Sequence, residues 1–249
     1  MSGHSKWATI KRKKAATDQA RGKVFSKYIK EITIAARQSG GDVETNPRLR
    51  TAIGAAKSVN MPANNIERAI KRGTGEVEGA NYEETQYEGY GPGGVALLVE
   101  VATDNRNRTA GDVRHIFTKN GGSLGEAGSV SYLFKPRGVI MIDKSAVAEE
   151  ALIEIALEAG ADDVSGDGDA FEVLTPQAQL EAVKLALAAK DIPVMSAEAT
   201  KLASLHVPVG EREAETIVRL MEALEDHDDV LRVYSNFSVS DDVLARLSR

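Results

Sequence analysis

Apolar residues recur at every third or fourth position through the first third of the chain, which is the spacing that places them on one face of a helix. Val24, Tyr28 and Ile32 belong to the first such run, and it predicts a helix over residues 17–38. Two further runs with the same period follow. A proline opens each of them, as suits the first turn of a helix, and the last run ends at Gly73. The pattern therefore predicts a small bundle of three helices.

From about residue 82 the apolar residues alternate between strand-like and helical runs. Residues 138–199 read strand, helix, strand, strand, helix, strand, which is the split βαβ unit of ferredoxin-like folds. The segments on either side, 82–134 and 211–237, each supply only part of a layer of strands and helices. Because these two segments would complete one another, we expect the stretch between them to be an inserted domain.

The predicted fold class is α+β. It comprises an N-terminal three-helix bundle with a basic arm, followed by two ferredoxin-like α/β domains, the last one inserted into the other. The predicted boundaries are 1–78 for the basic helical domain, 79–137 plus 206–249 for the discontinuous α/β domain, and 138–205 for the inserted ferredoxin-like domain. A chain of 249 residues suits two or three domains of ordinary size.

Charge divides the chain at about residue 75. The first 75 residues carry 16 Lys and Arg against 5 Asp and Glu, an excess of +11, whereas the other 174 carry 15 against 32, an excess of −17. An overall charge of −6 therefore conceals a basic N-terminal part on an acidic body. Such an asymmetry is typical of proteins whose basic part binds a polyanion.

The basic residues concentrate in the first 30 positions, where nine Lys and Arg accompany a single acid, Asp18. Surfaces that serve only solubility mix both signs, so we predict phosphate contacts, which give affinity and salt dependence rather than sequence choice. A solvated helix surface is the alternative interpretation. The predicted nucleic-acid-binding residues are Lys6, Lys11, Arg12, Lys13, Lys14, Arg21, Lys23, Lys27 and Lys30.

A second candidate anion site follows a predicted buried strand, in the segment Thr103–Thr109 (TDNRNRT). Arg106 and Arg108 fall at the start of the next predicted helix, where the helix dipole is already positive and cations are unfavourable. Two arginines placed there could form an anion site together with free backbone N–H groups. The alternative is that Asp104 and Asp112 neutralise them as surface pairs.

The sequence offers little for catalysis or for binding a metal. It has no cysteine, and its four histidines are scattered without metal-ligand spacing. Motifs for a serine nucleophile or a kinase are absent, and Gly89–Gly94 (GYGPGG) opens a strand, whereas a nucleotide-binding loop opens a helix. We therefore predict a non-enzymatic protein with no cofactor, no metal and no small-molecule substrate. An enzyme with an anion site at Arg106 and Arg108 is the remote alternative.

Two further expectations concern loops and location. The glycine-rich stretch Asn120–Gly128 predicts a flexible surface loop, and acidic pairs such as Asp228–Asp229 are interpreted as solvated surface. The longest apolar run, Val95–Val99, is too short to span a membrane. The first residues, MSGHSKW, have no apolar segment of a secretory signal, and the lack of cysteine fits a reducing compartment. The expected location is the cytoplasm, with no membrane partner.

Four segments of the chain closely resemble the YebC/PmpR family. They are MSGHSKWATIKRKKAATDQARGKVFSK, GYGPGGVALLVEV, TDNRNRT and KNGGSLGEAGSVSYLF. Together these motifs are highly specific, and the resemblance extends over essentially the whole chain. It implies a three-domain protein, cytoplasmic in bacteria, with a helical N-terminal domain and two α/β domains.

The resemblance also implies a nucleic-acid partner but leaves open which one. Family members are described as probable DNA-binding transcriptional regulators. Similar proteins are described as translation factors that help ribosomes through proline-rich stretches, and the mitochondrial relative activates translation of a cytochrome oxidase subunit. We predict a DNA-binding regulator of transcription, with a ribosome-associated translation factor as the alternative. The expected partners are DNA or ribosomal RNA, with ribosomal proteins as further candidates, since an acidic body can pair with basic proteins.

Overall fold

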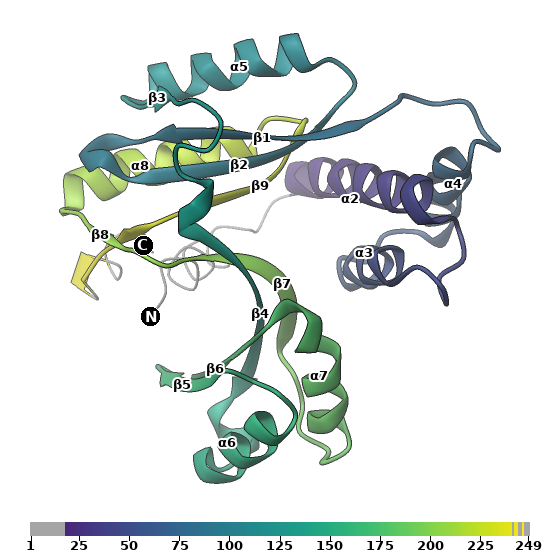
Figure 1. The fold of residues 1–249 in the computed structure, drawn as a ribbon, viewed down its shortest axis with the longest axis vertical. Coiled ribbons are helices and arrows are strands. Elements are labelled where there is room, and N and C mark those ends of the chain that lie inside the picture. Colours follow the sequence, from purple (N-terminus) through teal and green to yellow (C-terminus); the bar gives the residue numbers. More distant parts are fainter. Residues whose placement is uncertain (1–17, 241, 244–245, 247–249) are drawn as a thin grey trace. The chain divides into compact units, whose positions relative to one another are not determined.

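The computed structural model describes residues 18–240, 242, 243 and 246 (Figure 1). Residues 132–206 form one compact unit, and the described residues before and after them form a second. Both units combine α-helices with antiparallel sheets. The predicted α+β class is therefore confirmed.

Three helices open the larger unit: α2 (Asp18–Ser39), α3 (Pro47–Ser58) and α4 (Ala63–Thr74). Their apolar stripes meet in a buried core that includes Ile32, Leu49, Ile53, Ile66 and Ala69. Burial of this continuous cluster is what holds helices of only 12 residues together, because isolated helices of that length are marginal in water.

The side chain of Asn46 joins two of these helices. Its Oδ1 accepts the N–H of Leu49 at 3.0 Å and so caps α3. Its amide nitrogen donates to the carbonyl oxygens of Ala35 and Gly40 at 2.9 and 2.8 Å. One buried polar side chain thus fixes the start of α3 against the end of α2.

Gly73 lies inside α4 and marks the closest approach of α4 to α2. A Cβ atom at this position would lie 2.5 Å from the carbonyl oxygen of Thr33 and 2.6 Å from the Cβ of Ala36. The glycine that ends the helix is instead Gly75, whose φ of +84° is the left-handed conformation that closes helices. The predicted end of the third helix at Gly73 is thus one residue short of the observed end at Thr74, and the closing glycine is two residues further on than predicted.

Gly73→Ala is expected to destabilise the protein by about 1–3 kcal/mol, because the added methyl group overpacks the α2–α4 contact. The matched control is Gly54→Ala in α3, where a Cβ would meet nothing within 4 Å. That change should stabilise α3 by about 0.5–1 kcal/mol through helix propensity alone. Urea unfolding followed by circular dichroism measures both effects, and equal unfolding midpoints for the two variants would contradict the close contact.

The larger unit also contains a four-stranded antiparallel sheet in the order β3–β1–β2–β9. Its strands are β1 (Glu83–Tyr90), β2 (Ala96–Thr103), β3 (Ser123–Leu124) and β9 (Val230–Ser235). A short parallel pair, β8 (Val207–Pro208) with β10 (Phe237–Ser238), accompanies it. Strands from before and after residues 132–206 thus share one sheet.

Two helices, α5 (Arg106–Lys119) and α8 (Glu211–Glu225), pack with this sheet in a single core. Alternate residues of β2, Leu97 and Val99, are fully buried there together with Phe117 of α5. Because successive strand residues point to opposite faces, this alternation places both helices on the same face of the sheet.

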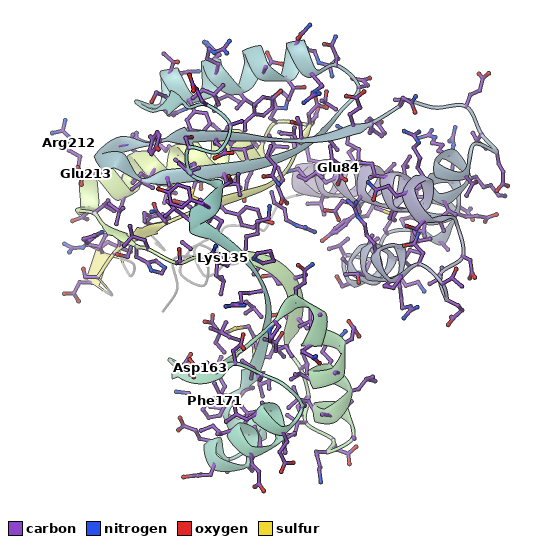
Figure 2. All side chains as sticks on the ribbon, in the orientation of Figure 1. Glu84, Lys135, Asp163, Phe171, Arg212 and Glu213 are labelled. Atoms are coloured by element: carbon purple, nitrogen blue, oxygen red, sulfur yellow. The ribbon has the colours of Figure 1, made fainter. Side chains whose placement is uncertain are left out.

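Ion pairs connect the bundle with the sheet inside this unit. Arg48 of α3 pairs with Glu84 at the start of β1, which Figure 2 labels. Glu31 of α2 lies 2.9 Å from Arg232 of β9. Burial raises the pKa of Glu31, and Arg232 partly opposes that rise. Since the bundle and the sheet form one compact unit, the predicted domain boundary at residue 78 stays a prediction.

The smaller unit contains a second four-stranded sheet, in the order β5–β6–β4–β7, with all pairings antiparallel. Its elements in chain order are β4 (Phe134–Asp143), α6 (Glu149–Glu158), β5 (Asp163–Asp167), β6 (Ala170–Thr175), α7 (Leu180–Ala188) and β7 (Ser196–Ala203). This order and this pairing are those of the predicted split βαβ unit. Ile140, Ile142 and Val173 of the sheet are buried in one core with Leu152 and Val183 of the helices.

Glu88 anchors the segment that follows the glycine-rich stretch Asn120–Gly128. Its buried carboxylate accepts the N–H groups of Gly128, Val130 and Ser131, each at 2.7 Å. Burial raises the pKa of Glu88, but these hydrogen bonds outweigh it and the pKa is lowered overall. The structure therefore gives this stretch an anchor that glycine content alone did not predict.

Candidate nucleic-acid interface

Three of the nine basic residues predicted to bind nucleic acid have described side chains. They are Lys23, Lys27 and Lys30, which follow one another along α2 at spacings of four and three residues. The others lie outside the described residues or side chains: Lys6, Lys11, Arg12, Lys13, Lys14 and Arg21. The structure therefore reports on one face of α2 and not on the basic arm.

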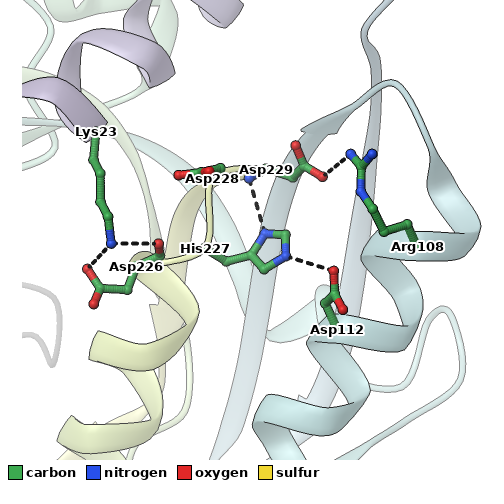
Figure 3. Close-up of a pocket in the computed structure, with 7 residues that line it drawn as sticks. All are labelled: Lys23, Arg108, Asp112, Asp226, His227, Asp228 and Asp229. Atoms are coloured by element: carbon green, nitrogen blue, oxygen red, sulfur yellow. Dashed lines mark hydrogen bonds and ion pairs between the residues drawn. The ribbon is translucent and has the colours of Figure 1, made fainter.

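Lys23 and Lys27 contact the C-terminal end of α8. The ammonium of Lys23 lies 3.2 Å from both the carbonyl oxygen and the Oδ1 of Asp226, as Figure 3 shows. Lys27 donates to the carbonyl oxygen of Glu225 at 2.6 Å. Carbonyl groups at a helix C-terminus carry the negative end of the helix dipole and attract cations. These two lysines therefore already bind negatively polarised oxygens within the protein.

Lys30 is buried and forms an internal ion pair. Its Nζ lies 2.7 Å from Oδ1 of Asp229 and donates to the carbonyl oxygens of Asp228 and Ala102 at 2.8 and 3.3 Å. The sequence predicted that Lys30 contacts nucleic acid or, in the alternative interpretation, lies on a solvated helix surface. The structure instead packs that position against the turn between α8 and β9, so the charge of Lys30 is neutralised inside the protein.

Asp229 is the centre of this contact. One carboxylate oxygen binds Lys30, and the other accepts hydrogen bonds from Thr109 at 2.7 Å, Thr103 at 3.1 Å and Arg108 at 3.1 Å. Burial opposes ionisation of this carboxyl group, but the hydrogen bonds from Lys30, Thr109 and Arg108 outweigh it and hold the pKa of Asp229 well below its usual range. The ionised carboxylate therefore ties α2, β2 and α5 to the α8–β9 turn.

Arg106 and Arg108 do not converge on a common acceptor. Arg108 binds Asp104 at 2.8 Å and Asp229 at 3.1 Å, whereas Arg106 donates to the hydroxyl of Thr85 at 3.2 Å. In addition, Asn105 caps α5 by accepting the N–H of Arg108. Of the two partners in the alternative interpretation, Asp104 pairs with Arg108, whereas Asp112 lies against His227; Asp229 was not predicted. Two arginines and free N–H groups are thus not assembled into an anion site here.

A cavity of about 510 Å³ lies beside this network (Figure 3). Acidic groups predominate in its lining, which consists of Lys23, Arg108, Asp112, Asp226, His227, Asp228 and Asp229. His227 accepts the N–H of Asp229 through Nδ1 at 3.1 Å, and its Nε2 lies 3.2 Å from Asp112. Because Nδ1 is an acceptor, the proton sits on Nε2, and the imidazole serves as a bridge between two elements. The four carboxylates of the lining therefore compete with any phosphate for the cations Lys23 and Arg108.

Neither a metal site nor a membrane span occurs in the part of the chain that the structure describes. Its His, Asp and Glu residues form no group of three that could hold a metal ion. None of its helices is both long and apolar enough to cross a membrane.

Comparison with protein families accounts for nearly the whole chain. Residues 5–76 match the model described as the TACO1/YebC protein N-terminal domain, and residues 82–237 match the one described as the TACO1/YebC second and third domain. The chain belongs to the TACO1/YebC family. The first matched region ends at residue 76 and the second begins at residue 82, where the chain passes from the bundle into β1.

Individual relatives agree with this assignment. A probable transcriptional regulatory protein of Desulfatibacillum aliphaticivorans is 59% identical over 244 residues, which cover 98% of this chain and 99% of the relative. One from Syntrophobacter fumaroxidans is 55% identical over 249 residues and the full length of both. The crystal structure of a conserved hypothetical protein from Aquifex aeolicus matches with a TM-score of 0.80 at 48% identity, covering 90% of this chain and 93% of that one. The family predicted from the sequence motifs is thereby confirmed.

Sequence reasoning missed Asp229, the residue on which this site depends. The pair Asp228–Asp229 was interpreted as solvated surface, but Asp229 is only 5% exposed. Its partners Lys30 and Arg108 lie 199 and 121 residues away in the chain. No local pattern in the sequence could have indicated such distant contacts.

Proposed function

We propose that this protein is a non-enzymatic regulator of gene expression that binds DNA through its basic N-terminal segment. The observation that carries the proposal is the excess of 16 basic over 5 acidic residues in the first 75 positions. The names of relatives such as the protein from Desulfatibacillum aliphaticivorans support a role in transcription. We further propose that the protein acts in the cytoplasm.

The proposed contact set consists of the basic arm, Arg21, and the two outer lysines of α2. Lys23 is 45% exposed and bound to a surface carboxylate, so it can exchange Asp226 for a phosphate oxygen of the same charge. Lys27 can likewise exchange a carbonyl oxygen for a phosphate oxygen. Lys30 is buried against Asp229 and is therefore not one of the proposed nucleic-acid contacts.

Asp226→Asn is expected to raise the affinity for duplex DNA about two- to fivefold, because exposed ion pairs are worth up to about 1 kcal/mol and Lys23 is then released. The control is Glu215→Gln, an exposed acid 11 residues earlier in α8 and about 16 Å away along the helix. Fluorescence anisotropy at fixed salt measures both. Equal gains in DNA affinity for the two variants would mean that each acid simply repels DNA, and that Asp226 does not compete with phosphate for Lys23.

A ribosome-associated translation factor is the second candidate. The acidic remainder of the chain, 32 Asp and Glu against 15 Lys and Arg, favours it, because a strongly acidic body is repelled by long DNA. Crowded ribosomal surfaces, in contrast, offer basic proteins with which it can pair. This version predicts salt-sensitive co-sedimentation with ribosomes, and a protein that stays free at low salt would exclude it.

One experiment decides between the two partners. Crosslinking in cells, followed by sequencing of the attached nucleic acid, is expected to recover chromosomal DNA with a preferred sequence. Recovery of ribosomal RNA would instead establish the translation factor. Competition by unrelated duplex provides the in vitro counterpart, since a sequence-reading regulator should keep its target when non-specific DNA is in excess.

The enzyme alternative receives no support from the geometry around Arg106 and Arg108. Their partners are Thr85, Asp104 and Asp229, which leaves no shared position for a substrate anion. If Arg106 and Arg108 were catalytic, replacing both by alanine would abolish the catalytic activity, whereas alanine replacements in the basic arm would leave it unchanged. The binding proposal predicts the opposite order of effects on DNA affinity.

A further inference from the structure

A second cavity, of about 590 Å³, lies at the C-terminal ends of α2 and α4. Arg37 from the last turn of α2 lines it, together with Arg72 and the glycines that follow in α4, and the segment from Val77 to Asn81 forms the remaining wall. We call it the Arg37–Arg72 cavity. In contrast to the cavity beside Asp229, its lining contains two arginines and only one acid, Glu78.

The close contact between the helices brings the two arginines to the same cavity. A Cβ on Gly73 would lie 3.1 Å from the backbone nitrogen of Arg37 and 2.6 Å from the Cβ of Ala36. Arg72 and Arg37 therefore leave the backbone directly beside the point where α2 and α4 touch. The two guanidinium groups therefore contribute positive charge to one cavity.

Neither arginine has a partner among the described residues. No hydrogen bond or ion pair joins Arg37 or Arg72 to another described side chain or carbonyl group, and the Nε of Arg72 is buried with no acceptor among the described residues. Buried donors in proteins are nearly always paired, so an orphaned one calls for a water or an ion. Beside two guanidinium groups, an anion with oxygen atoms would both accept this hydrogen bond and balance the positive charge.

The chain at Gly79 holds Arg72 in place. A Cβ on Gly79 would lie 3.2 Å from Cδ and 3.3 Å from Cγ of Arg72, so the backbone rests on the aliphatic stem of the arginine. A stem fixed in this way leaves less conformational freedom to be lost when the guanidinium binds a ligand.

Acceptors of the cavity lining that belong to the described residues make no bond to these arginines. The carbonyl of Lys71 accepts the N–H groups of Glu76 and Val77, and the carbonyl of Arg72 accepts that of Gly75. The carboxylate of Glu78 is exposed and makes no ion pair with either arginine. The positive charge of the cavity is thus available to a ligand.

We infer that the Arg37–Arg72 cavity binds a phosphate group, and that this phosphate belongs to a nucleic-acid backbone. That the phosphate comes from a nucleic-acid backbone rests on the proposed function. That the cavity binds a phosphate group rests on the residues of the cavity itself. Planar guanidinium groups bind phosphate oxygens in pairs, and the glycines around them leave the backbone uncovered. The cavity adds a fixed phosphate contact to those proposed for the basic arm.

The test compares two double variants of the full-length protein with equal loss of charge. Arg37→Gln with Arg72→Gln removes the cavity's cations, whereas Arg68→Gln with Arg114→Gln removes two exposed arginines outside it. The cavity variant should lose tenfold or more in affinity for a 20-base-pair duplex, and its salt slope should fall by about 1–2. The control should lose threefold or less. Equal losses overturn the inference.

A third variant, Gly79→Val, keeps every charge and displaces the stem of Arg72. It lies between α4 and β1, outside any helix or strand, so it should fold even if the arginine variants do not. We expect it to weaken duplex binding about three- to tenfold. Unchanged affinity in this variant would overturn the role assigned to Arg72.

A second probe, inorganic phosphate, separates failure of this inference from failure of the proposed function. Wild-type protein should show a saturable shift of the Arg72 Nε–H resonance with inorganic phosphate, and this shift should be absent in Arg37→Gln. If the wild type binds no nucleic acid but shows that shift, the proposed function fails, the phosphate site stands and the backbone source is overturned. If no shift occurs, the site itself is overturned.

Discussion

Replacement of residues 11–14 (Lys-Arg-Lys-Lys) by alanine is expected to lower the affinity for duplex DNA by about 10- to 100-fold at moderate salt. Binding releases about one counterion for each phosphate that the protein neutralises, and the variant neutralises fewer phosphates. The dependence of log affinity on log salt should therefore become shallower by about 3 to 4 units of slope. Fluorescence anisotropy over a series of salt concentrations measures both quantities. This is the largest effect that the proposed function predicts for any short segment.

A control with the same composition separates direct binding from net charge. Lys119, Lys135, Lys190 and Arg212 are four exposed cations outside the bundle, and Figure 2 labels Lys135 and Arg212. Their replacement by alanine also removes three lysines and one arginine. We expect the affinity to fall by less than about threefold and the salt slope to stay unchanged. An equal fall in both variants would mean that general attraction, and no contact by the N-terminal segment, drives binding.

Asp229→Ala is expected to lower the free energy of unfolding by about 3–5 kcal/mol, because it leaves Lys30 as an unpaired buried charge. The hydroxyl groups of Thr103 and Thr109 lose their acceptor in the same step. Urea unfolding followed by circular dichroism measures the destabilisation. The neighbouring exposed residue provides the control, since Asp228→Ala should change stability by less than about 0.5 kcal/mol.

A double variant tests whether the buried charge is the cause. Asp229→Ala combined with Lys30→Met removes both charges and should recover a substantial part of the stability that Asp229→Ala alone removes. If the double variant is less stable than the single one, the ion pair does not explain the effect and packing around Asp229 does.

Because the pKa of Asp229 is lowered in the folded state, the free energy of unfolding should depend on pH. A carboxyl group with a lower pKa in the folded state stabilises the protein fully above the pKa of the unfolded chain, and this contribution is lost as the pH falls through the folded pKa. Wild-type stability should therefore decline below about pH 4. In Asp229→Asn the decline should be smaller, because the titrating group is gone. Unfolding curves at pH 7, 4 and 3 measure the difference.

Much of the fold could be predicted from periodicity because it depends on neighbours in sequence. The run containing Val24, Tyr28 and Ile32 predicted a helix over 17–38, and α2 spans Asp18–Ser39. The ferredoxin-like order of strands and helices in residues 138–199 was likewise predicted from periodicity. The role of Gly73 in the α2–α4 contact could not be predicted. A glycine near a helix end gives the same sequence pattern whether it ends the helix or allows a neighbouring helix to pack closely.

The candidate interface was less predictable because its contacts join distant parts of the chain. The pairing of Arg108 with Asp104, four residues away, was the alternative interpretation of the segment Thr103–Thr109. The contacts of Lys30 and Arg108 with Asp229 were not predicted, because nothing in the sequence near residue 229 marks it as buried. Charge composition therefore identified a basic region but assigned Lys30 to solvent, where the structure has an internal ion pair.

The salt dependence of duplex DNA binding by the wild-type protein decides whether its basic N-terminal segment binds the nucleic-acid backbone. If the basic N-terminal segment makes about five phosphate contacts, log affinity should fall with log salt at a slope of about −4 to −5. A slope near zero would contradict the claim that this segment binds the nucleic-acid backbone.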